Sequence, residues 1–306
     1  MRVAVIDCGT NTVRLYIADG EPGGPLAEVI RQTAYVRLGE GVDANRQFTE
    51  GALTRTFAAV DQFAQLIDQA GVERVRFIAT SAARDVINRQ ALFDGVYARL
   101  GVDPDVISGE EEAALSFAGA LSGGPVTGPV LVTDIGGGST EFVLGDATGR
   151  ITAKVSTDLG SVRLRERYLH SNPPTLPEFG QAVEFVEATL AAVEFDWGEV
   201  ETWLGVAGTC TSLSAMAMDL TTYDRSLVHN SVLRDDQIER LTMSLMTLTV
   251  RQTMARYPTL EPLRAEVICA GALILDRAML RVKRPLIVRE TDILDGAARR
   301  LLDLPS

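Results

Sequence analysis

An internal repeat constrains this chain more than any other feature of its sequence. Residues 7–19 align without a gap with residues 134–146, and each copy directly follows a short apolar run. The matching pairs are Asp7 with Asp134, Gly9 with Gly136, Thr12 with Ser139, and Asp19 with Asp146. A two-strand unit with a turn of Gly, Ser, Thr or Asn therefore occurs twice, which indicates a duplicated fold.

The segments that follow the two copies are also similar in kind. In each half, a helical pattern precedes a short strand that ends in small polar residues. The helices are expected at about 49–70 and 177–193, and the strands at 74–79 and 202–206. Strands that alternate with helices predict an α/β fold with two largely parallel sheets, each opened by a hairpin.

The length of 306 residues exceeds what a single hydrophobic core usually organises, so two domains are expected. A Gly/Pro-rich stretch at 122–129 is the natural linker, which gives domains 1–124 and 125–306. The final helix, about 293–302, is a candidate to pack on the first domain, although the sequence leaves its position open. A long amphipathic helical region is expected at 235–256.

Charge and composition exclude several classes of function. A net charge of −12 argues against a general nucleic-acid binder, because it repels polyanions at long range. His170 and His229 are the only histidines, so any metal should be a hard cation held by carboxylates. No apolar run approaches the roughly 20 residues of a membrane span. With no secretory signal and three isolated cysteines, a cytoplasmic protein is expected.

The two hairpin turns are candidate anion sites. In such turns, Gly and small hydroxyl residues let backbone N–H groups converge on an anion. Residues 136–140 form the stronger case, since three successive glycines directly follow an apolar strand and Asp134. A purely structural hairpin is the alternative for a single turn. The gapless second copy favours two facing turns that clamp a phosphate.

Two carboxylates flank the second turn. Asp134 ends a buried strand and Glu141 begins the next one. Carboxylates at this spacing are often only solvated surface or caps. A charge at the end of a buried strand needs a partner, however, and a divalent cation or a backbone nest would provide it.

A group of three glutamates opens the helix that is expected from residue 109 onward. Ser108 suits the N-cap of this helix, and Glu111 lies at the capping-box position three residues later. Acidic residues in a first turn also suit the helix dipole, so Glu110 and Glu111 need no further function. Glu112 is left over, at a strand end where open α/β sheets bind ligands.

Arg14 and Arg84 are the basic candidates. Arg14 aligns with Glu141 in the repeat, and Arg84 follows another strand end. Either residue is compatible with an ordinary surface position. In an acidic protein, a guanidinium fork at a strand end is also a natural partner for phosphate oxygens.

Five motifs in order resemble the exopolyphosphatase and guanosine pentaphosphate phosphohydrolase family of the actin-like ATPase superfamily. They are Asp7-Cys-Gly-Thr-Asn-Thr-Val-Arg-Leu15, Ala79-Thr-Ser-Ala-Ala-Arg-Asp-Val-Ile-Asn88, Ile107-Ser-Gly-Glu-Glu-Glu-Ala113, Thr133-Asp-Ile-Gly-Gly-Gly-Ser-Thr-Glu141 and Ala207-Gly-Thr-Cys-Thr-Ser212. The resemblance spans nearly the whole chain. It implies two duplicated actin-like (ribonuclease H-like) domains with an interdomain cleft.

The resemblance also implies roles for individual residues. The family's catalytic glutamate, directly before Ala113, falls on Glu112, and its metal-associated carboxylates fall on Asp134 and Glu141. The implied phosphate contacts are Asn11, Arg14, Arg84, Gly137, Gly138, Ser139, Gly208, Thr209 and Arg264. One departure is clear: many relatives have Arg-Glu-Gly where this chain has Leu294-Asp-Gly296, so contacts there are not transferred.

By this resemblance, the chain is expected to be a Mg²⁺-dependent, or Mn²⁺-dependent, exopolyphosphatase that releases orthophosphate from inorganic polyphosphate. Guanosine pentaphosphate is the alternative substrate, and the chain is expected to form a homodimer. Two other classes stay open: an actin-like kinase or ATPase, and a non-catalytic binder of polyphosphate or alarmone. The Ser-Gly-x-x-Glu-Ala motif at 108–113 argues against the kinase, and intact Glu112, Asp134 and Glu141 argue against the binder.

Overall fold

The computed structural model describes residues 1–304 and contains two compact units. The first comprises Met1–Gly119 together with the C-terminal segment from Ile293, and the second comprises Ala120–Asp292. The chain passes from the first unit into the second inside helix α5 (Gly109–Ser122), just before the Gly/Pro-rich stretch. The C-terminal helix α14 (Ile293–Asp303) belongs to the first unit.

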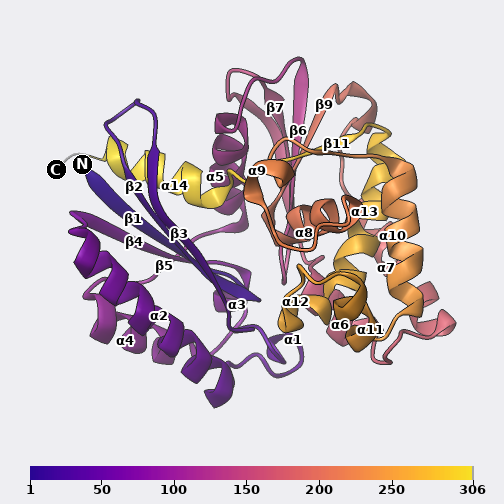
Figure 1. Cartoon of the computed structure of the whole chain (residues 1–306), viewed down its shortest axis with the longest axis horizontal. Coiled ribbons are helices and arrows are strands. Elements are labelled where there is room, and N and C mark those ends of the chain that lie inside the picture. The colour runs from indigo at the N-terminus through magenta and orange to yellow at the C-terminus, as the bar shows by residue number, and fades with distance from the viewer. Residues whose placement is uncertain (305–306) are drawn as a thin grey trace. The chain divides into compact units, whose positions relative to one another are not determined.

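The first unit is built on a five-stranded sheet with the order β3-β2-β1-β4-β5 (Figure 1). Its strands are β1 (Arg2–Cys8), β2 (Thr12–Asp19), β3 (Ala27–Tyr35), β4 (Arg74–Ala79) and β5 (Asp105–Val106). β1, β2 and β3 form an antiparallel meander, whereas β4 and β5 run parallel to β1. The repeat thus opens the sheet with the predicted hairpin.

Helices cover both faces of this sheet (Figure 1). α2 (Glu50–Ala70) and α4 (Arg89–Leu100) cover one face, and α5 and α14 cover the other (Figure 1). The short helices α1 (Val42–Asn45) and α3 (Ser81–Arg84) complete the unit. Because side chains alternate along a strand, Ala4 and Ile6 of β1 pack in one core with Phe63 of α2. Val3 and Val5 pack in the opposite core, which α5 and α14 supply.

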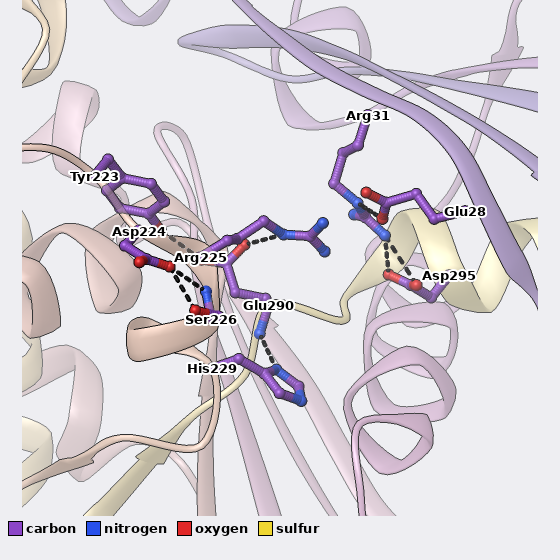
Figure 2. Close-up of polar contacts among 9 residues, drawn as sticks. All are labelled: Glu28, Arg31, Tyr223, Asp224, Arg225, Ser226, His229, Glu290 and Asp295. Carbon is purple, nitrogen blue, oxygen red and sulfur yellow. Dashed lines mark hydrogen bonds and ion pairs between the residues drawn. The ribbon is translucent and has the colours of Figure 1, made fainter.

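Polar and steric contacts anchor α14 within the first unit. Arg31 of β3 donates to both carboxylate oxygens of Asp295, at 2.9 and 2.8 Å, and also contacts Glu28 at 2.9 Å (Figure 2). A Cβ on Gly296 would lie 2.0 Å from the carbonyl oxygen of Leu115, so only glycine lets α14 cross α5 this closely. The Leu-Asp-Gly segment that departs from the family pattern therefore serves this packing.

The second unit contains a six-stranded sheet with the order β10-β11-β9-β6-β7-β8. Its strands are β6 (Pro129–Ile135), β7 (Thr140–Asp146), β8 (Ile151–Thr157), β9 (Thr202–Val206), β10 (Val232–Leu233) and β11 (Leu286–Val288). β6, β7 and β8 form an antiparallel meander, β9 and β11 run parallel to β6, and β10 is antiparallel to β11.

The helices of the second unit surround a core in which Trp203 is fully buried. They are α6 (Ser161–Tyr168), α7 (Leu176–Ala191), the 3-10 helix η1 (Trp197–Glu199), α8 (Ala207–Ala217), α9 (Arg225–Val228), α10 (Asp235–Thr247), α11 (Val250–Arg256), α12 (Pro262–Ala265) and α13 (Ile268–Val282). The indole nitrogen of Trp203 donates to the Thr133 hydroxyl at 2.8 Å, which satisfies its polar atom.

The two sheets share one strand order, which confirms the duplication and the α/β class. Reading outward from the hairpin, β3-β2-β1-β4-β5 corresponds to β8-β7-β6-β9-β11 with the same strand directions. The expectation of largely parallel sheets was wrong, since both sheets are mixed. Each repeat continues into a third strand, β3 or β8, that returns beside its predecessor, and a short return makes an antiparallel neighbour.

The helical region expected at 235–256 consists of two helices. α10 ends at Thr247 and α11 starts at Val250. Thr249 caps α11 by accepting from the Gln252 backbone N–H, and the Gln252 side chain accepts from the Thr249 backbone N–H. Thr249 and Gln252 have the sequence spacing of a capping box, which starts a new helix although the amphipathic pattern continues.

Candidate active site

The turn between β1 and β2 places Asn11 in the interior of the first unit. Asn11 is 4% exposed, and within residues 1–304 neither polar atom of its side chain has a hydrogen-bond partner. The Thr10 carbonyl accepts from the Gly39 N–H at 2.8 Å, and the Asn11 carbonyl accepts from the Arg37 N–H at 2.9 Å. A buried amide without partners is costly in a folded protein, so Asn11 is suited to a ligand that supplies the missing hydrogen bonds.

Asp7 and Arg14 lie opposite each other at this turn. Their backbones pair across β1 and β2, and the Arg14 guanidinium donates to one Asp7 carboxylate oxygen, from Nη2 at 2.6 Å and Nε at 3.1 Å. Both side chains are largely buried. The ion pair accounts for the Asp7 charge, and the expected phosphate contact of Arg14 stays a prediction.

Arg84 lies against Glu112 at the carboxyl ends of β4 and β5. One Arg84 nitrogen, Nη1, donates both to Glu112 Oε2 at 2.8 Å and to the Ile107 carbonyl oxygen at 3.0 Å. The two side chains are 24% and 11% exposed. The structure therefore brings together two residues that the sequence assigned to one site, and it joins Arg84 to the expected catalytic carboxylate. Its predicted phosphate contact is untested.

The neighbouring glutamate of the same helix has a structural role. The Glu111 backbone N–H donates to the Ser108 hydroxyl at 3.1 Å, as expected of an N-cap. The Glu111 side chain does not reach back to Ser108. It pairs with Arg76 at 3.0 Å and with Arg300 at 3.1 Å, so the expected capping box forms only in half.

Helix α6 orients the Gly136–Gly138 turn of the second unit. The Ser161 N–H donates to the Gly136 carbonyl at 2.9 Å, and the Val162 N–H donates to the Gly137 carbonyl at 2.8 Å. In a trans peptide the C=O and the next N–H point in opposite directions. The N–H groups of Gly137 and Gly138 therefore face away from α6, as an anion-binding turn requires.

Gly160 allows this close approach, and it was not among the residues predicted from the sequence. A Cβ on Gly160 would lie 2.3 Å from the Gly137 carbonyl oxygen and 2.4 Å from the Gly138 carbonyl carbon. Its φ of −132° is ordinary, so space and not conformational freedom requires glycine. A glycine just before a helix resembles an ordinary N-cap, so no sequence signal distinguishes it.

Asp134 and Glu141 occupy, in the second unit, the positions of Asp7 and Arg14. They are directly opposed across β6 and β7, are 7% and 1% exposed, and so share one face of the sheet. The Ser156 hydroxyl donates to Glu141 Oε1 at 2.7 Å. Where the first copy pairs a carboxylate with a guanidinium, the second places two carboxylates together, an arrangement that a divalent cation stabilises. The described residues contain no group of three or more His, Cys, Asp or Glu side chains placed to hold a metal.

A strained residue begins helix α8 beside the expected Gly208-Thr209 contacts. Ala207 has a φ of 64°, a left-handed conformation that costs a residue other than glycine about 1–2 kcal/mol. No side chain caps the N-terminus of α8. Its first amide groups therefore remain free to bind an anion. Sequence patterns do not report φ, so Ala207 was also missed.

Gly208 and Thr209 are held by their neighbours. A Cβ on Gly208 would lie 2.0 Å from Arg264 Nη2, so the buried guanidinium of Arg264 lies directly on this glycine. The Thr209 hydroxyl donates to the Ile135 carbonyl at 3.1 Å, and its hydrogen is thus already used. The structure gathers three expected phosphate contacts at one strand end. Ser139, 3% exposed, lies in the neighbouring hairpin turn.

The cysteines and His229 lie outside the proposed chemistry. Burial raises the pKa of the Cys210 thiol, and the nearby Asp134 carboxylate raises it further. Burial raises the pKa of the Cys8 thiol in the same way, with Asp7 as the second cause. Burial also raises the pKa of Cys269 to about 12, so the neutral thiols are poor nucleophiles. His229 Nδ1 accepts from the Glu290 N–H at 3.1 Å (Figure 2). His229 Nε2 contacts the Gly123 carbonyl at 3.0 Å, so both ring nitrogens have structural partners.

Comparison with known proteins decides the family. A model described as the Ppx/GppA phosphatase family matches residues 16–292. The chain belongs to this family. This confirms the resemblance that the five motifs indicated. No helix in residues 1–304 combines the length and apolar character needed to cross a membrane.

Individual relatives agree with the family assignment. Exopolyphosphatase 2 of Mycobacterium tuberculosis (strain ATCC 25618 / H37Rv) is 43% identical over an alignment of 318 positions, which covers 98% of each protein. Guanosine-5'-triphosphate,3'-diphosphate pyrophosphatase of Photobacterium profundum is 28% identical and matches 90% of this chain but 52% of its own length. The crystal structure of an exopolyphosphatase-like protein, 36% identical, superposes with a TM-score of 0.92 over 99% of this chain and 100% of that one.

Proposed function

We propose that this chain hydrolyses the terminal phosphate of inorganic polyphosphate and releases orthophosphate. The choice of substrate is supported by one observation. This chain and the relative named Exopolyphosphatase 2 align over almost the full length of both proteins. The chemistry is supported by the Glu112 carboxylate, which an ion pair holds at a strand end of the first unit. Ligands of α/β folds bind at such ends.

In this mechanism Glu112 accepts a proton from a water molecule as that water attacks the terminal phosphorus. The bond from phosphorus to the bridging oxygen breaks, and the remaining polyphosphate leaves on that oxygen. Because the transition state of phosphoryl transfer is loose, catalysis consists mainly of positioning and charge stabilisation. In the first unit, the residues proposed to take part are Glu112, Arg84 and Asn11. In the second unit, the proposed anion-binding groups are the amides of the glycine turn and of the start of α8, where Arg264 lies against Gly208.

A metal ion would complete the charge balance. Mg²⁺, or Mn²⁺, would be held by Asp134 and Glu141, whose opposed carboxylates suit a hard cation. When bound, it would supply positive charge to the phosphate oxygens. The remaining positive charge and hydrogen-bond donors come from the Arg264 guanidinium and from backbone amides of this chain.

Guanosine pentaphosphate is the second candidate substrate. It is favoured by the match to the pyrophosphatase of Photobacterium profundum, which is named for that compound. That relative extends well beyond the matched region, whereas Exopolyphosphatase 2 does not. The same residues would remove the 5′ terminal phosphate of the nucleotide.

Side-by-side hydrolysis tests the choice of substrate. Orthophosphate release is measured with Mg²⁺ from polyphosphate, guanosine pentaphosphate and ATP at equal concentrations of terminal phosphate. We expect polyphosphate to give the highest kcat/KM. A higher value with guanosine pentaphosphate would assign the alternative, and a preference for ATP would assign the chain to the kinase or ATPase class.

A further inference from the structure

We propose that Thr10, Thr80 and Ser81, together with Asn11, form an uncharged cradle that binds the oxygen atoms of one phosphate unit of the substrate. These four residues are called the hydroxyl cradle below. The inference rests on the proposed function, since it assumes a phosphate substrate. It adds three residues, Thr10, Thr80 and Ser81, to the predicted contacts.

The sheet register brings the cradle together. β1 and β4 are parallel neighbours, with Cys8 opposite Ala79, so the segments that follow them emerge at the same edge. Thr10 and Asn11 follow β1, and Thr80 and Ser81 follow β4. All four are buried, with exposures of 4–7%. The Thr10 and Ser81 hydroxyl oxygens are 2.9 Å apart, which joins the two segments directly.

A count of hydrogens shows donors that the protein does not use. Thr10 and Ser81 each carry one hydroxyl hydrogen, and their mutual hydrogen bond consumes one of the two. Within residues 1–304 the other has no acceptor. Both polar atoms of the Asn11 amide are buried and likewise have no hydrogen-bond partner in that range. The Thr80 hydroxyl belongs to the same strand end, and Thr80 directly precedes Ser81 in the segment that follows β4. Buried donors are normally satisfied, so this concentration at one strand end indicates a ligand rich in acceptor oxygens.

A second hydroxyl pair in the same chain shows the ordinary arrangement. The hydroxyl oxygens of Ser214 and Ser231 are 2.6 Å apart. The Ser231 hydroxyl donates onward to the Val228 carbonyl at 2.7 Å, and Ser214 can then donate to Ser231. Both hydrogens are thereby used. Among the described residues, no further acceptor takes the second hydroxyl hydrogen of the pair formed by Thr10 and Ser81.

The duplication explains why the first unit has a cradle of this kind. Asp7 lies opposite Ile78 and Asp134 opposite Val206, so Ser81 corresponds to Thr209. The Thr209 hydroxyl donates to the Ile135 carbonyl. The counterpart of Thr10 in the repeat is Gly137, which has no side chain. The hydroxyl pair with an unused hydrogen is therefore specific to the first copy.

The chemistry of the cradle selects an anion oxygen and predicts its response to salt. Its unused groups are mainly N–H and O–H donors, so phosphate oxygens are suitable partners. None of its side chains is charged. Since salt screens contacts between charges, loss of these contacts should weaken binding by a similar factor at low and high ionic strength.

The test measures binding of sodium tripolyphosphate by calorimetry in a Glu112→Gln parent, in which hydrolysis is expected to be about 10²- to 10⁴-fold slower. The variants in this parent are Thr10→Val with Ser81→Ala, Thr80→Val alone, and Ser214→Ala as the matched control. Hydrogen bonds to charged groups predict affinities about 10- to 100-fold lower for the first two. The ratio of each variant's affinity to that of the parent should be similar at about 0.05 M and about 0.5 M salt. Ser214→Ala should bind like the parent.

The outcomes separate the cradle from the proposed function. If the parent binds tripolyphosphate and the variants bind it equally well, the cradle fails while the proposed function stands. If the parent binds none and the wild-type protein releases no orthophosphate, the proposed function fails and the cradle fails with it. Thermal unfolding checks folding, and Thr80→Val decides alone if the double variant does not fold. A defect that disappears in high salt would also overturn the cradle.

Discussion

Arg84→Met tests whether Arg84 orients the catalytic carboxylate or contacts the substrate. The Arg84 guanidinium lies 2.8 Å from Glu112 Oε2 and 3.0 Å from the Ile107 carbonyl, with side-chain exposures of 24% for Arg84 and 11% for Glu112. Removing one partner of a largely buried ion pair costs about 1–3 kcal/mol. A displaced catalytic group costs about 10²-fold in rate. We therefore expect kcat to fall about 10²-fold, with KM changed less than about 3-fold.

Steady-state orthophosphate release over a range of polyphosphate concentrations separates kcat from KM. Arg76→Met is the matched control, since Arg76 pairs with the adjacent Glu111 at 3.0 Å and should affect stability but not kcat. Arg84→Lys keeps the charge without the fork and should lie between wild type and Arg84→Met. A KM raised 10- to 100-fold at nearly constant kcat would refute the orienting role and favour a direct phosphate contact.

Three further changes test other parts of the account. Gly160→Ala places a Cβ 2.3 Å from the Gly137 carbonyl oxygen. We therefore expect urea unfolding to show a loss of about 1–3 kcal/mol in stability, and kcat/KM to fall at least about 10-fold. Wild-type values of both would contradict the described turn. Ala207→Gly relieves a φ of 64° and should raise the free energy of unfolding by about 1 kcal/mol, whereas a loss would show that the strain is absent. Backbone and hydroxyl hydrogen bonds from Thr175 and Ser171 lower the pKa of Glu178 to about 2. The Glu178 carboxylate therefore contributes fully to the free energy of unfolding above about pH 4.5, and this contribution declines as the pH falls toward 2. The stability advantage of wild type over Glu178→Gln should accordingly narrow between pH 5 and pH 3, and a constant difference would reject this cap.

Much of the fold was predictable because duplication leaves a direct trace in sequence. The alignment of Asp7 with Asp134 reappears as matching hairpin registers, with Arg14 opposite Asp7 and Glu141 opposite Asp134. β4 and β9 have the predicted bounds. The third strands β3 and β8 were not anticipated, and they make both sheets mixed. Much of β3 is exposed on the sheet edge, so it lacks the apolar pattern that reveals a buried strand.

The candidate site was predictable in residue type but not in its partners. Motifs located Glu112 and Arg84, whereas their ion pair depends on where α3 and α5 begin in space. The requirement for glycine at 160 and the strain at Ala207 arise from tertiary contacts and from φ, neither of which has a sequence pattern. The donors of the hydroxyl cradle become visible only when each hydrogen is assigned an acceptor. The interdomain cleft stays a prediction.

The most direct test of the central claim compares wild type with Glu112→Gln in two assays on one polyphosphate preparation with Mg²⁺. The first measures orthophosphate release and the second measures binding by calorimetry. We predict that Glu112→Gln binds polyphosphate about as well as wild type and releases orthophosphate about 10²- to 10⁴-fold more slowly, as loss of a general base requires. Equal rates of release from the two proteins would contradict the assignment of Glu112 and the mechanism built on it.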